Sequence, residues 1–360
     1  MKRIGIIGGG QLGLMIAQAA KELGAQTIVL DPSSDAPAFV LGAADERIVA
    51  SFTDAAALEE LCQRSDVVTY EFENIPAEQL IPLCEKYNIK QGYAPLLDSQ
   101  DRLREKSNAV ARGLLSPRFE AVDSMESLRK AVEVVGLPAV LKSRTLGYDG
   151  RGQMVLRSEA DIAAAEDLVS VPCILEEFIS YDFECSTIVI RSKDESVVLP
   201  IAENRHRDGI LDLSVVPAPS LSEAMQERIK AQSLRFMEES GYEGILTIEY
   251  FIQGDKALFN EMAPRPHNSG HYSIEGTTSS QYRALCEYLL DMPLSESKLI
   301  APTVMKNVLG EELESAMQLT PEEGLYIHMY GKSESRAKRK MGHITAVGVS
   351  EFKYKLEIKS

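Results

Sequence analysis

The chain has 360 residues, of which 44% are hydrophobic and 26% are charged, and its formal net charge is −16. This composition is ordinary for a globular protein and excludes a disordered or fibrous chain, and the length predicts about two to three domains. The acidic balance argues against a general nucleic-acid-binding protein, because such a protein needs a basic face.

The five cysteines are odd in number and include no C-x-x-C pair, which favours a reducing compartment over a disulfide framework. No apolar run reaches the length of a membrane span, about 18 residues. The apolar start of the chain ends at Gly8 and is too short for a signal peptide. We therefore expect a cytoplasmic protein with no membrane partner.

The first 95 residues alternate between short β-rich runs and stretches with helical spacing of apolar residues. This alternation predicts a parallel sheet with helices on both faces. The expected strands and helices cover residues 3–7, 12–23, 26–30, 54–62 and 66–72, with Asp54 as the N-cap of the second helix.

From about residue 100 the pattern changes to a smaller α+β segment and then a larger antiparallel α+β segment. A charged helix is expected first, and two strands then flank a glycine-rich loop. A hairpin that turns at Gly254 and Asp255 is expected later. These elements cover residues 102–112, 138–142, 153–156, 173–179, 183–190, 245–252 and 256–262.

Gly8, Gly10 and Gly13 form a G-x-G-x-x-G pattern between the first strand and the first helix. A helix N-terminus attracts phosphate, and Asp31 lies where the ribose-binding acid of a dinucleotide site would stand. Three interpretations remain open at this point. The turn binds NAD, it binds a phosphate or sugar of another ligand, or its glycines serve strand–helix packing alone.

Glu71, Glu73 and Asn74 follow a predicted strand at its carboxyl end, where open α/β sheets bind ligands. They predict a ligand site, with a solvated turn before Pro76 as the alternative.

The segment from Lys142 to Gln153 holds three glycines whose N–H groups are suited to cover phosphates. Lys142, Arg144 and Arg151 favour an anion there, although a flexible hairpin tip is also consistent.

Glu249 and the pair Asn260–Glu261 lie on the two strands of the predicted hairpin. A three-residue turn places Glu249 opposite Glu261, whereas a two-residue turn places it opposite Asn260. Opposed carboxylates repel each other, and a divalent cation removes that penalty. Mg²⁺ takes one or two carboxylates together with substrate phosphates, so a magnesium site is predicted, with exposed strand glutamates as the alternative.

Residues 263–271 are dense in arginine, histidine and asparagine between prolines, which suits an anionic ligand. For either histidine of this segment, a structural role is the alternative.

Near the end of the chain, Arg336, Lys338, Arg339 and Lys340 are nearly contiguous. This basic run is either a solvated loop or a docking point for a phosphate monoester.

Together these motifs resemble the ATP-grasp superfamily and, within it, the N5-carboxyaminoimidazole ribonucleotide synthetase family. The residues that carry the resemblance are 8–13, 70–74, 147–153, 260–271 and 339–343, in this order. The resemblance implies a Rossmann-like parallel-sheet domain over 1–100, a central ATP-grasp lid domain over 101–180 and a C-terminal ATP-grasp domain over 181–360. It also makes NAD an improbable ligand, because the family's glycine-rich turn helps to hold a ribonucleotide.

The resemblance implies the following site residues. The nucleotide-site positions are Arg102, Lys142, Gly147, Tyr148, Asp149, Gly150, Arg151, Gly152, Gln153, Glu176, Glu177, Phe178, Ile179, Glu184, His206, Asn260 and Glu261. The metal ligands are Glu249 and Glu261. The substrate positions are Gly10, Gln11, Leu12, Glu71, Glu73, Asn74, Tyr148, Arg151, Arg265, His267, Asn268, Ser269, Arg339 and Lys340. The catalytic residues are Asp149, Arg265, His267 and Lys340.

The implied activity is that of an ADP-forming ligase in purine biosynthesis, which uses ATP with Mg²⁺ or Mn²⁺. Bicarbonate attacks the γ-phosphate to give carboxyphosphate, and the exocyclic amine of 5-aminoimidazole ribonucleotide captures the carboxyl group from carboxyphosphate or from CO₂ released by it. Positioning and charge neutralisation drive such phosphoryl transfer. The family is commonly dimeric, which predicts a homodimer by analogy. The alternatives are a formate-dependent glycinamide ribonucleotide transformylase and a nucleotide-binding protein without turnover. Leu146 departs from the family pattern, which usually has glycine there.

Overall fold

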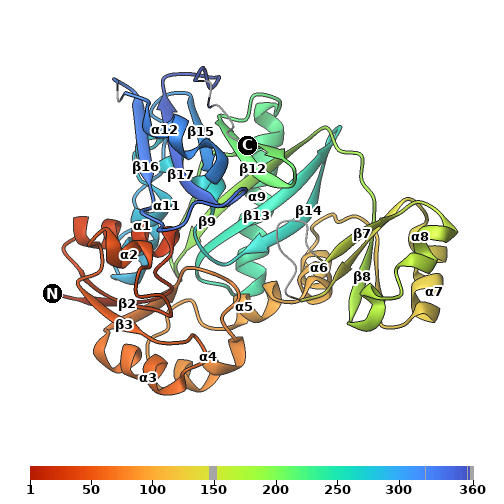
Figure 1. Ribbon diagram of the computed structural model, residues 1–360, viewed down its shortest axis with the longest axis horizontal. Coiled ribbons are helices and arrows are strands. Elements are labelled where there is room, and N and C mark those ends of the chain that lie inside the picture. Colours follow the sequence, from red (N-terminus) through yellow and green to blue (C-terminus); the bar gives the residue numbers. More distant parts are fainter. Residues whose placement is uncertain (146–151, 321, 355, 357–360) are drawn as a thin grey trace.

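The computed structural model describes residues 1–145, 152–320, 322–354 and 356, which form three sheets with their helices (Figure 1). Leu146 and the predicted site residues Gly147, Tyr148, Asp149, Gly150 and Arg151 lie outside the described residues. The sheets change between β4 and β5 and between β8 and β9. The predicted domain boundaries at residues 100 and 180 stay predictions.

The N-terminal sheet is parallel, with the strand order β3-β2-β1-β4. Its strands are β1 (Arg3–Ile7), β2 (Gln26–Asp31), β3 (Glu46–Val49) and β4 (Val67–Tyr70). Its helices are α1 (Gln11–Glu22), α2 (Pro37–Val40), α3 (Ala55–Arg64), α4 (Ala77–Cys84) and α5 (Ala94–Ser99). The side chain of Asp54 caps α3 by accepting from the N–H groups of Ala56 and Ala57, as the sequence predicts. The α/β prediction for this segment is confirmed.

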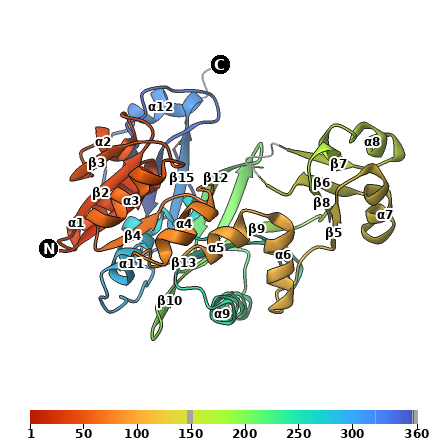
Figure 2. The same cartoon turned by 90° about the horizontal axis from the view of Figure 1, so that it is seen from below.

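The second sheet is small and antiparallel, with the order β5-β8-β6-β7. It contains β5 (Phe119–Val122), β6 (Ala139–Ser143), β7 (Gln153–Leu156) and β8 (Cys173–Glu177). With α7 (Met125–Val135), α8 (Glu159–Ala164) and η1 (Leu168–Ser170) it encloses a core of its own. Figure 2 shows this unit at the opposite end of the molecule from the N-terminal sheet, with α6 (Arg102–Ala111) between them.

The third sheet is antiparallel, and its described strands follow the order β14-β13-β9-β11-β12-β15-β17-β16, with β10 beside β9. The strands are β9 (Phe183–Arg191), β10 (Ser196–Val198), β11 (Ala202–Arg207), β12 (Ile210–Val216), β13 (Gly244–Gln253), β14 (Lys256–Ala263), β15 (Thr303–Leu309), β16 (Leu325–Met329) and β17 (Lys340–Val347). The other helical elements are α9 (Glu223–Ser240), η2 (Asn268–Gly270), α10 (Ser273–Gly276), α11 (Gln281–Leu289), η3 (Gly310–Glu312) and α12 (Leu313–Met317).

Two apolar clusters join this sheet to its neighbours. Residues of α9 share one cluster with β9, β13 and β14, while residues of α11 share another with α1 of the N-terminal segment. The N-terminal sheet is therefore fixed to the large sheet by a continuous core, which positions the carboxyl ends of its strands beside β13 and β14.

The glycine-rich turn is closed by the protein's own carboxylates. Gly9 N–H donates to Asp31 Oδ2 at 2.8 Å, while Gly10 N–H and Gly13 N–H donate to the two oxygens of Glu71 at 2.7 and 2.5 Å. A pyrophosphate needs these same N–H groups. The dinucleotide interpretation is therefore wrong for this turn, and Asp31 acts as a structural acceptor rather than a ribose ligand.

Gly13→Ala tests the packing role of the turn. A Cβ at Gly13 would lie 2.2 Å from Gly8 O, so the strand and helix have to separate. We expect the free energy of unfolding to fall by about 1–3 kcal/mol in urea denaturation, the usual cost of overpacking. Gln18→Ala, on the exposed side of the same helix, is the control and should leave the midpoint unchanged. An unchanged midpoint for Gly13→Ala would contradict this account.

Candidate active site

One cavity of about 850 Å³ lies where the three sheets meet. Of the predicted site residues, those that line it are Gln11, Leu12, Glu71, Glu73, Asn74, Arg102, Lys142, Gln153, Glu176, Glu177, Phe178, Ile179, Glu184, His206, Glu249, Asn260, Glu261, Arg265, His267, Asn268 and Lys340. Among the described residues, Gly10, Gly152, Ser269 and Arg339 were predicted for the site but are not part of this lining.

Glu176, on β8, holds two lysines at one wall of the cavity. Its Oε2 lies 3.0 Å from Lys142 Nζ, at the end of β6, and 3.3 Å from Lys106 Nζ, on α6. Burial alone raises the pKa of Glu176, but the two ammonium groups outweigh burial and lower the pKa to about 2. Glu176 Oε1 is buried and has no hydrogen-bond partner in the described part of the chain.

Lys106 lies behind this wall of the cavity, in contact with Glu176, and the sequence analysis missed it. It is fully buried, its Nζ donates to Asn260 O at 2.7 Å, and it lies 5.6 Å from the centre of the Phe259 ring. Burial lowers the pKa of Lys106. Its spacing of four residues from Arg102 places both on one face of the helix, and this spacing was the available signal.

Arg144 was grouped with Lys142 as an anion-binding residue. In the structure its Nε lies 3.0 Å from Asp101 Oδ1, and its Nη2 contacts the other carboxylate oxygen. Asp101 also accepts from Leu103 N–H and Arg104 N–H as the N-cap of α6. Arg144 therefore ties the small sheet to the start of α6.

The hairpin of β13 and β14 combines features of both predicted registers. Its turn has two residues, because Gln253 pairs with Lys256, and yet Glu249 pairs with Glu261. A bulge at Asn260 inserts one extra residue and restores the carboxylate pair. Two facing carboxylates are the oxygen donors that Mg²⁺ prefers, so the donor set fits this ion.

Further carboxylates surround this pair. Glu261 Oε2 lies 3.3 Å from Arg102 Nη1. Glu105, buried on α6, accepts from Met262 N–H at 2.5 Å. Burial and the charge of Glu261 raise the pKa of Glu105 to about 8. A raised pKa favours the protonated form of Glu105, and a neutral Glu105 does not repel the nearby carboxylates.

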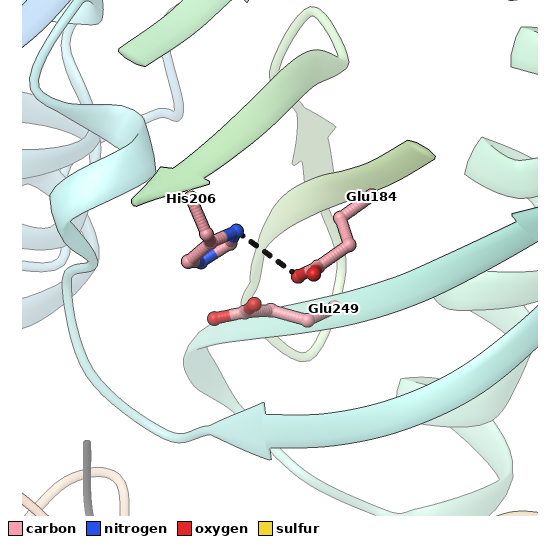
Figure 3. A group of neighbouring side chains, drawn as sticks. All are labelled: Glu184, His206 and Glu249. Carbon is pink, nitrogen blue, oxygen red and sulfur yellow. Dashed lines mark ion pairs between the residues drawn. The ribbon is translucent and has the colours of Figure 1, made fainter. Parts of the chain in front are cut away.

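Glu184, His206 and Glu249 point toward one another from β9, β11 and β13 (Figure 3). One ligand atom of each lies within 4.8 Å of the others, so this group is able to hold a metal ion. His206 Nδ1 is 3.2 Å from Glu184 Oε2, and Tyr181 Oη donates to Glu184 Oε1 at 2.6 Å. Burial raises the pKa of Glu184 more than His206 lowers it.

Arg265 and His267 are both paired with carboxylates. Arg265 Nη2 donates to Glu73 Oε1 at 2.9 Å, and its Nε contacts the other oxygen. Burial alone raises the pKa of Glu73, but the charge and hydrogen bonds of Arg265 outweigh burial and lower the pKa to about 2. His267 Nε2 lies 2.9 Å from Glu249 Oε1. Both ring nitrogens of His267 are engaged, since Nδ1 lies 2.8 Å from Ser269 Oγ.

The C-terminal basic run divides in the structure. Lys340, at the start of β17, lines the cavity, and Lys332 Nζ donates to its carbonyl at 2.8 Å. Burial lowers the pKa of Lys332 to about 8. Arg339 Nη1 instead donates to Glu334 O at 2.7 Å, in an exposed contact. Arg336, which contacts Glu334 in an exposed ion pair, supports the solvated-loop interpretation for the tip of the run.

The cleft lies between two α+β units, and it is lined by lysines, by a pair of facing carboxylates and by the edge of a Rossmann-like sheet. This combination defines an ATP-grasp enzyme. Three family models match the chain in order. They are the ribonucleotide synthetase preATP-grasp domain over residues 1–95, the ATP-grasp domain over 107–282 and the phosphoribosylaminoimidazole carboxylase C-terminal domain over 303–355.

An N5-carboxyaminoimidazole ribonucleotide synthase from Staphylococcus aureus (strain COL) is 42% identical over 354 residues, which is 96% of this chain and 92% of the relative. The S. aureus synthetase complexed with ADP has a TM-score of 0.91 at 39% identity, over 96% of this chain and 93% of that one. An Aspergillus clavatus synthase in complex with ADP and 5-aminoimidazole ribonucleotide has a TM-score of 0.88 at 29% identity, over 96% and 93%. The chain belongs to the N5-carboxyaminoimidazole ribonucleotide synthase family of ATP-grasp ligases.

None of the described helices is both long enough and apolar enough to cross a membrane.

Lys106→Met tests the role of the missed lysine. The change leaves the Asn260 carbonyl without its donor and removes one of the two cations that Glu176 contacts, so the wall of the cavity that carries Lys142 loses two buried contacts. A charge-assisted hydrogen bond contributes about 1.5–3 kcal/mol, so we expect ATP affinity to fall by roughly 10- to 150-fold in equilibrium titration. Lys130→Met, at an exposed ion pair, is the matched control. ATP affinity within twofold of wild type would show that Lys106 has no such role.

Proposed function

We propose that this chain carboxylates 5-aminoimidazole ribonucleotide to N5-carboxyaminoimidazole ribonucleotide, with ATP and bicarbonate, in purine biosynthesis. The observation that carries the proposal is the single cavity. It joins the lysine wall at Glu176, the carboxylate pair on β13 and β14, and the segment from Arg265 to Asn268. A relative of this family is described with ADP and the aminoimidazole ribonucleotide bound together.

ATP is proposed to lie between the small and the large sheet. Lys142, held by Glu176, is proposed to neutralise phosphate charge, and Glu176 is proposed to begin the stretch that reads the adenine edge. Residues 177–179 lie beside it on the cavity wall. Glu184 and His206 are proposed to bind the ribose or another part of the nucleotide, as the resemblance implies. Gly152 and Gln153 are proposed to cover the phosphates.

Glu249 and Glu261 are proposed to hold Mg²⁺, with Mn²⁺ as a possible substitute. The ion supplies charge neutralisation on the phosphates when it is bound. Asn260 stands beside the pair and is proposed to contact the nucleotide or the ion's water. Arg102, which contacts Glu261, keeps that carboxylate directed along the cavity wall and brings a second cation to the phosphates.

The aminoimidazole ribonucleotide is proposed to lie between the edge of the parallel sheet and the large sheet. Gln11, Leu12, Glu71, Glu73 and Asn74 line the first side. Arg265, His267, Asn268 and Lys340 line the second side. Gly10 and Arg339, which lie outside the described lining, are proposed to support this region from behind. Tyr148, Asp149 and Arg151, outside the described residues, keep their predicted substrate roles as part of this proposal.

In the proposed reaction, a bicarbonate oxygen attacks the γ-phosphorus of ATP, and the bond to the bridging oxygen breaks to release ADP. The resulting carboxyphosphate transfers its carboxyl group to the exocyclic amine, directly or through CO₂, and inorganic phosphate leaves. The amine gives up one proton in this step. Exclusion of water matters because carboxyphosphate hydrolyses readily.

We also propose a cytoplasmic homodimer. The compartment is supported by the five cysteines, all of which are free thiols in the structure. The dimer is proposed by analogy with the family and is tested by sedimentation of the purified chain.

Glu261→Gln tests the metal assignment. Loss of one carboxylate of the pair removes charge that Mg²⁺ needs, so we expect turnover to be abolished and the fold to be retained. Circular dichroism checks the fold, and Mg²⁺ titration of ADP release checks the metal. Glu120→Gln, on an exposed strand position, is the control. Normal turnover with unchanged Mg²⁺ dependence would remove Glu261 from the metal site.

The substrate assignment is tested by ADP release with each component omitted in turn. We expect release to rise when 5-aminoimidazole ribonucleotide and bicarbonate are both present, and not with glycinamide ribonucleotide and formate. Release that ignores the aminoimidazole nucleotide would leave only a general ATP-grasp activity. ATP binding without release under any combination would favour a nucleotide-binding protein without turnover.

A further inference from the structure

A chain of buried polar side chains lies beneath His267 and has no place in the proposed chemistry. Its members are Ser269 on η2, Ser186 on β9, Asn204 on β11 and Ser214 on β12, each at most 3% exposed. Ser186 pairs with Glu249 in the register of β9 and β13, and Asn204 pairs with Ser214. The chain therefore crosses the large sheet directly beside the proposed metal ligand.

Each link of this chain has hydrogen-bond geometry. Ser214 Oγ lies 2.9 Å from Asn204 Oδ1, and Asn204 Nδ2 lies 3.0 Å from Ser186 Oγ. Ser186 Oγ lies 2.7 Å from Ser269 Oγ, which lies 2.8 Å from His267 Nδ1. At the other side of the ring, His267 Nε2 lies 2.9 Å from Glu249 Oε1.

The chemistry of the groups fixes the direction of donation. An amide nitrogen only donates, so Ser186 Oγ accepts from Asn204. In the contact between the two hydroxyl groups, Ser186 Oγ is the donor and Ser269 Oγ is the acceptor. Ser269 Oγ then donates to His267 Nδ1. A second observation agrees, because Ser269 N–H, which also only donates, lies 3.3 Å from the same Nδ1. Nδ1 is therefore an acceptor, and the proton of the neutral ring is on Nε2.

We infer that Ser269, Ser186 and Asn204 are positioning residues that hold His267 in the tautomer whose Nε2–H donates to Glu249. The other tautomer would place the Nε2 lone pair against a carboxylate oxygen, and Glu249 would lose its donor. Groups that hydrogen-bond to a metal ligand orient it and support metal affinity. Ser269, expected to bind substrate, acts through His267 in this assignment. The tautomer is independent of the proposed function, whereas its effect on metal affinity rests on that function.

The opposite face of β9 offers a matched control. Thr187 and Ser233 are fully buried, and their hydroxyl oxygens lie 2.9 Å apart. Ser233 also contacts Tyr250 Oη at 2.8 Å. Ser233, on α9, packs against the face of β9 opposite to Ser186. Ser233→Ala therefore removes a buried hydroxyl that is as fully hydrogen-bonded as that of Ser186. It changes nothing that contacts His267.

The test is the tautomer of His267 in the metal-free protein, measured above pH 8 by NMR with ring-¹⁵N histidine. The spectrum of His267→Gln assigns the signals. Wild type and Ser233→Ala should show protonated Nε2 and bare Nδ1. Asn204→Asp replaces the amide donor by an acceptor, which reverses the chain and should transfer the proton to Nδ1. Ser186→Ala interrupts the chain and should shift the Nδ1 signal by a smaller amount.

Mg²⁺ titration of ADP release supplies the second readout. The Mg²⁺ concentration for half-maximal release should rise about tenfold or more in Asn204→Asp, in line with other groups that support metal ligands, and stay unchanged in Ser233→Ala. If neither the wild type nor any variant releases ADP, the proposed function fails, but the result on the tautomer of His267 still stands. A wild-type ring protonated on Nδ1, or on both nitrogens, overturns the inference. So does a folded Asn204→Asp or Ser186→Ala whose His267 signals match wild type. If Asn204→Asp does not fold, Ser186→Ala decides.

Discussion

The arrangement of the cleft depends on the carboxylate of Glu176. It is buried on β8 and contacts two lysines, one from the small sheet and one from α6. The α6 lysine also binds the carbonyl of Asn260, the extra residue of the bulge. One ionised group thus connects the small sheet, α6 and the hairpin that carries the carboxylate pair. Removal of one partner from a buried ion pair leaves an uncompensated charge, so loss of one member of this cluster is expected to disturb the others.

Three arginines of the cleft are also paired with carboxylates. Arg265 contacts Glu73, Arg102 contacts Glu261, and Arg144 contacts Asp101. In a chain of net charge −16, these arginines reach the cleft beside carboxylates. Under the proposed function, an incoming phosphate would exchange partners with a carboxylate instead of meeting an isolated cation, and the ionised state of each carboxylate would then be part of ligand binding.

Local sequence patterns were sufficient to predict several elements of the fold. Strand and helix periodicity predicted the parallel sheet, the helix 102–112 and the hairpin, and the N-cap at Asp54 is confirmed. The long helix α9 and strands β15 to β17 were not anticipated. Closure of the glycine-rich turn by Glu71 could not be predicted, because it depends on a contact across 58 residues or more. Lys106 was missed because a lysine in a charged helix resembles a solvated residue until β14 packs against it.

The bulge at Asn260 has a consequence for how this chain tolerates changes of length. With a two-residue turn and no bulge, the residue opposite Glu249 is the one at position 260. Loss of one residue between Lys256 and Glu261 would therefore remove the bulge and still leave the glutamate opposite Glu249. A second loss has no bulge to remove, and because side chains alternate between the faces of a strand it would direct the glutamate to the opposite face. The bulge thus gives this strand tolerance to one shortening, but not to two.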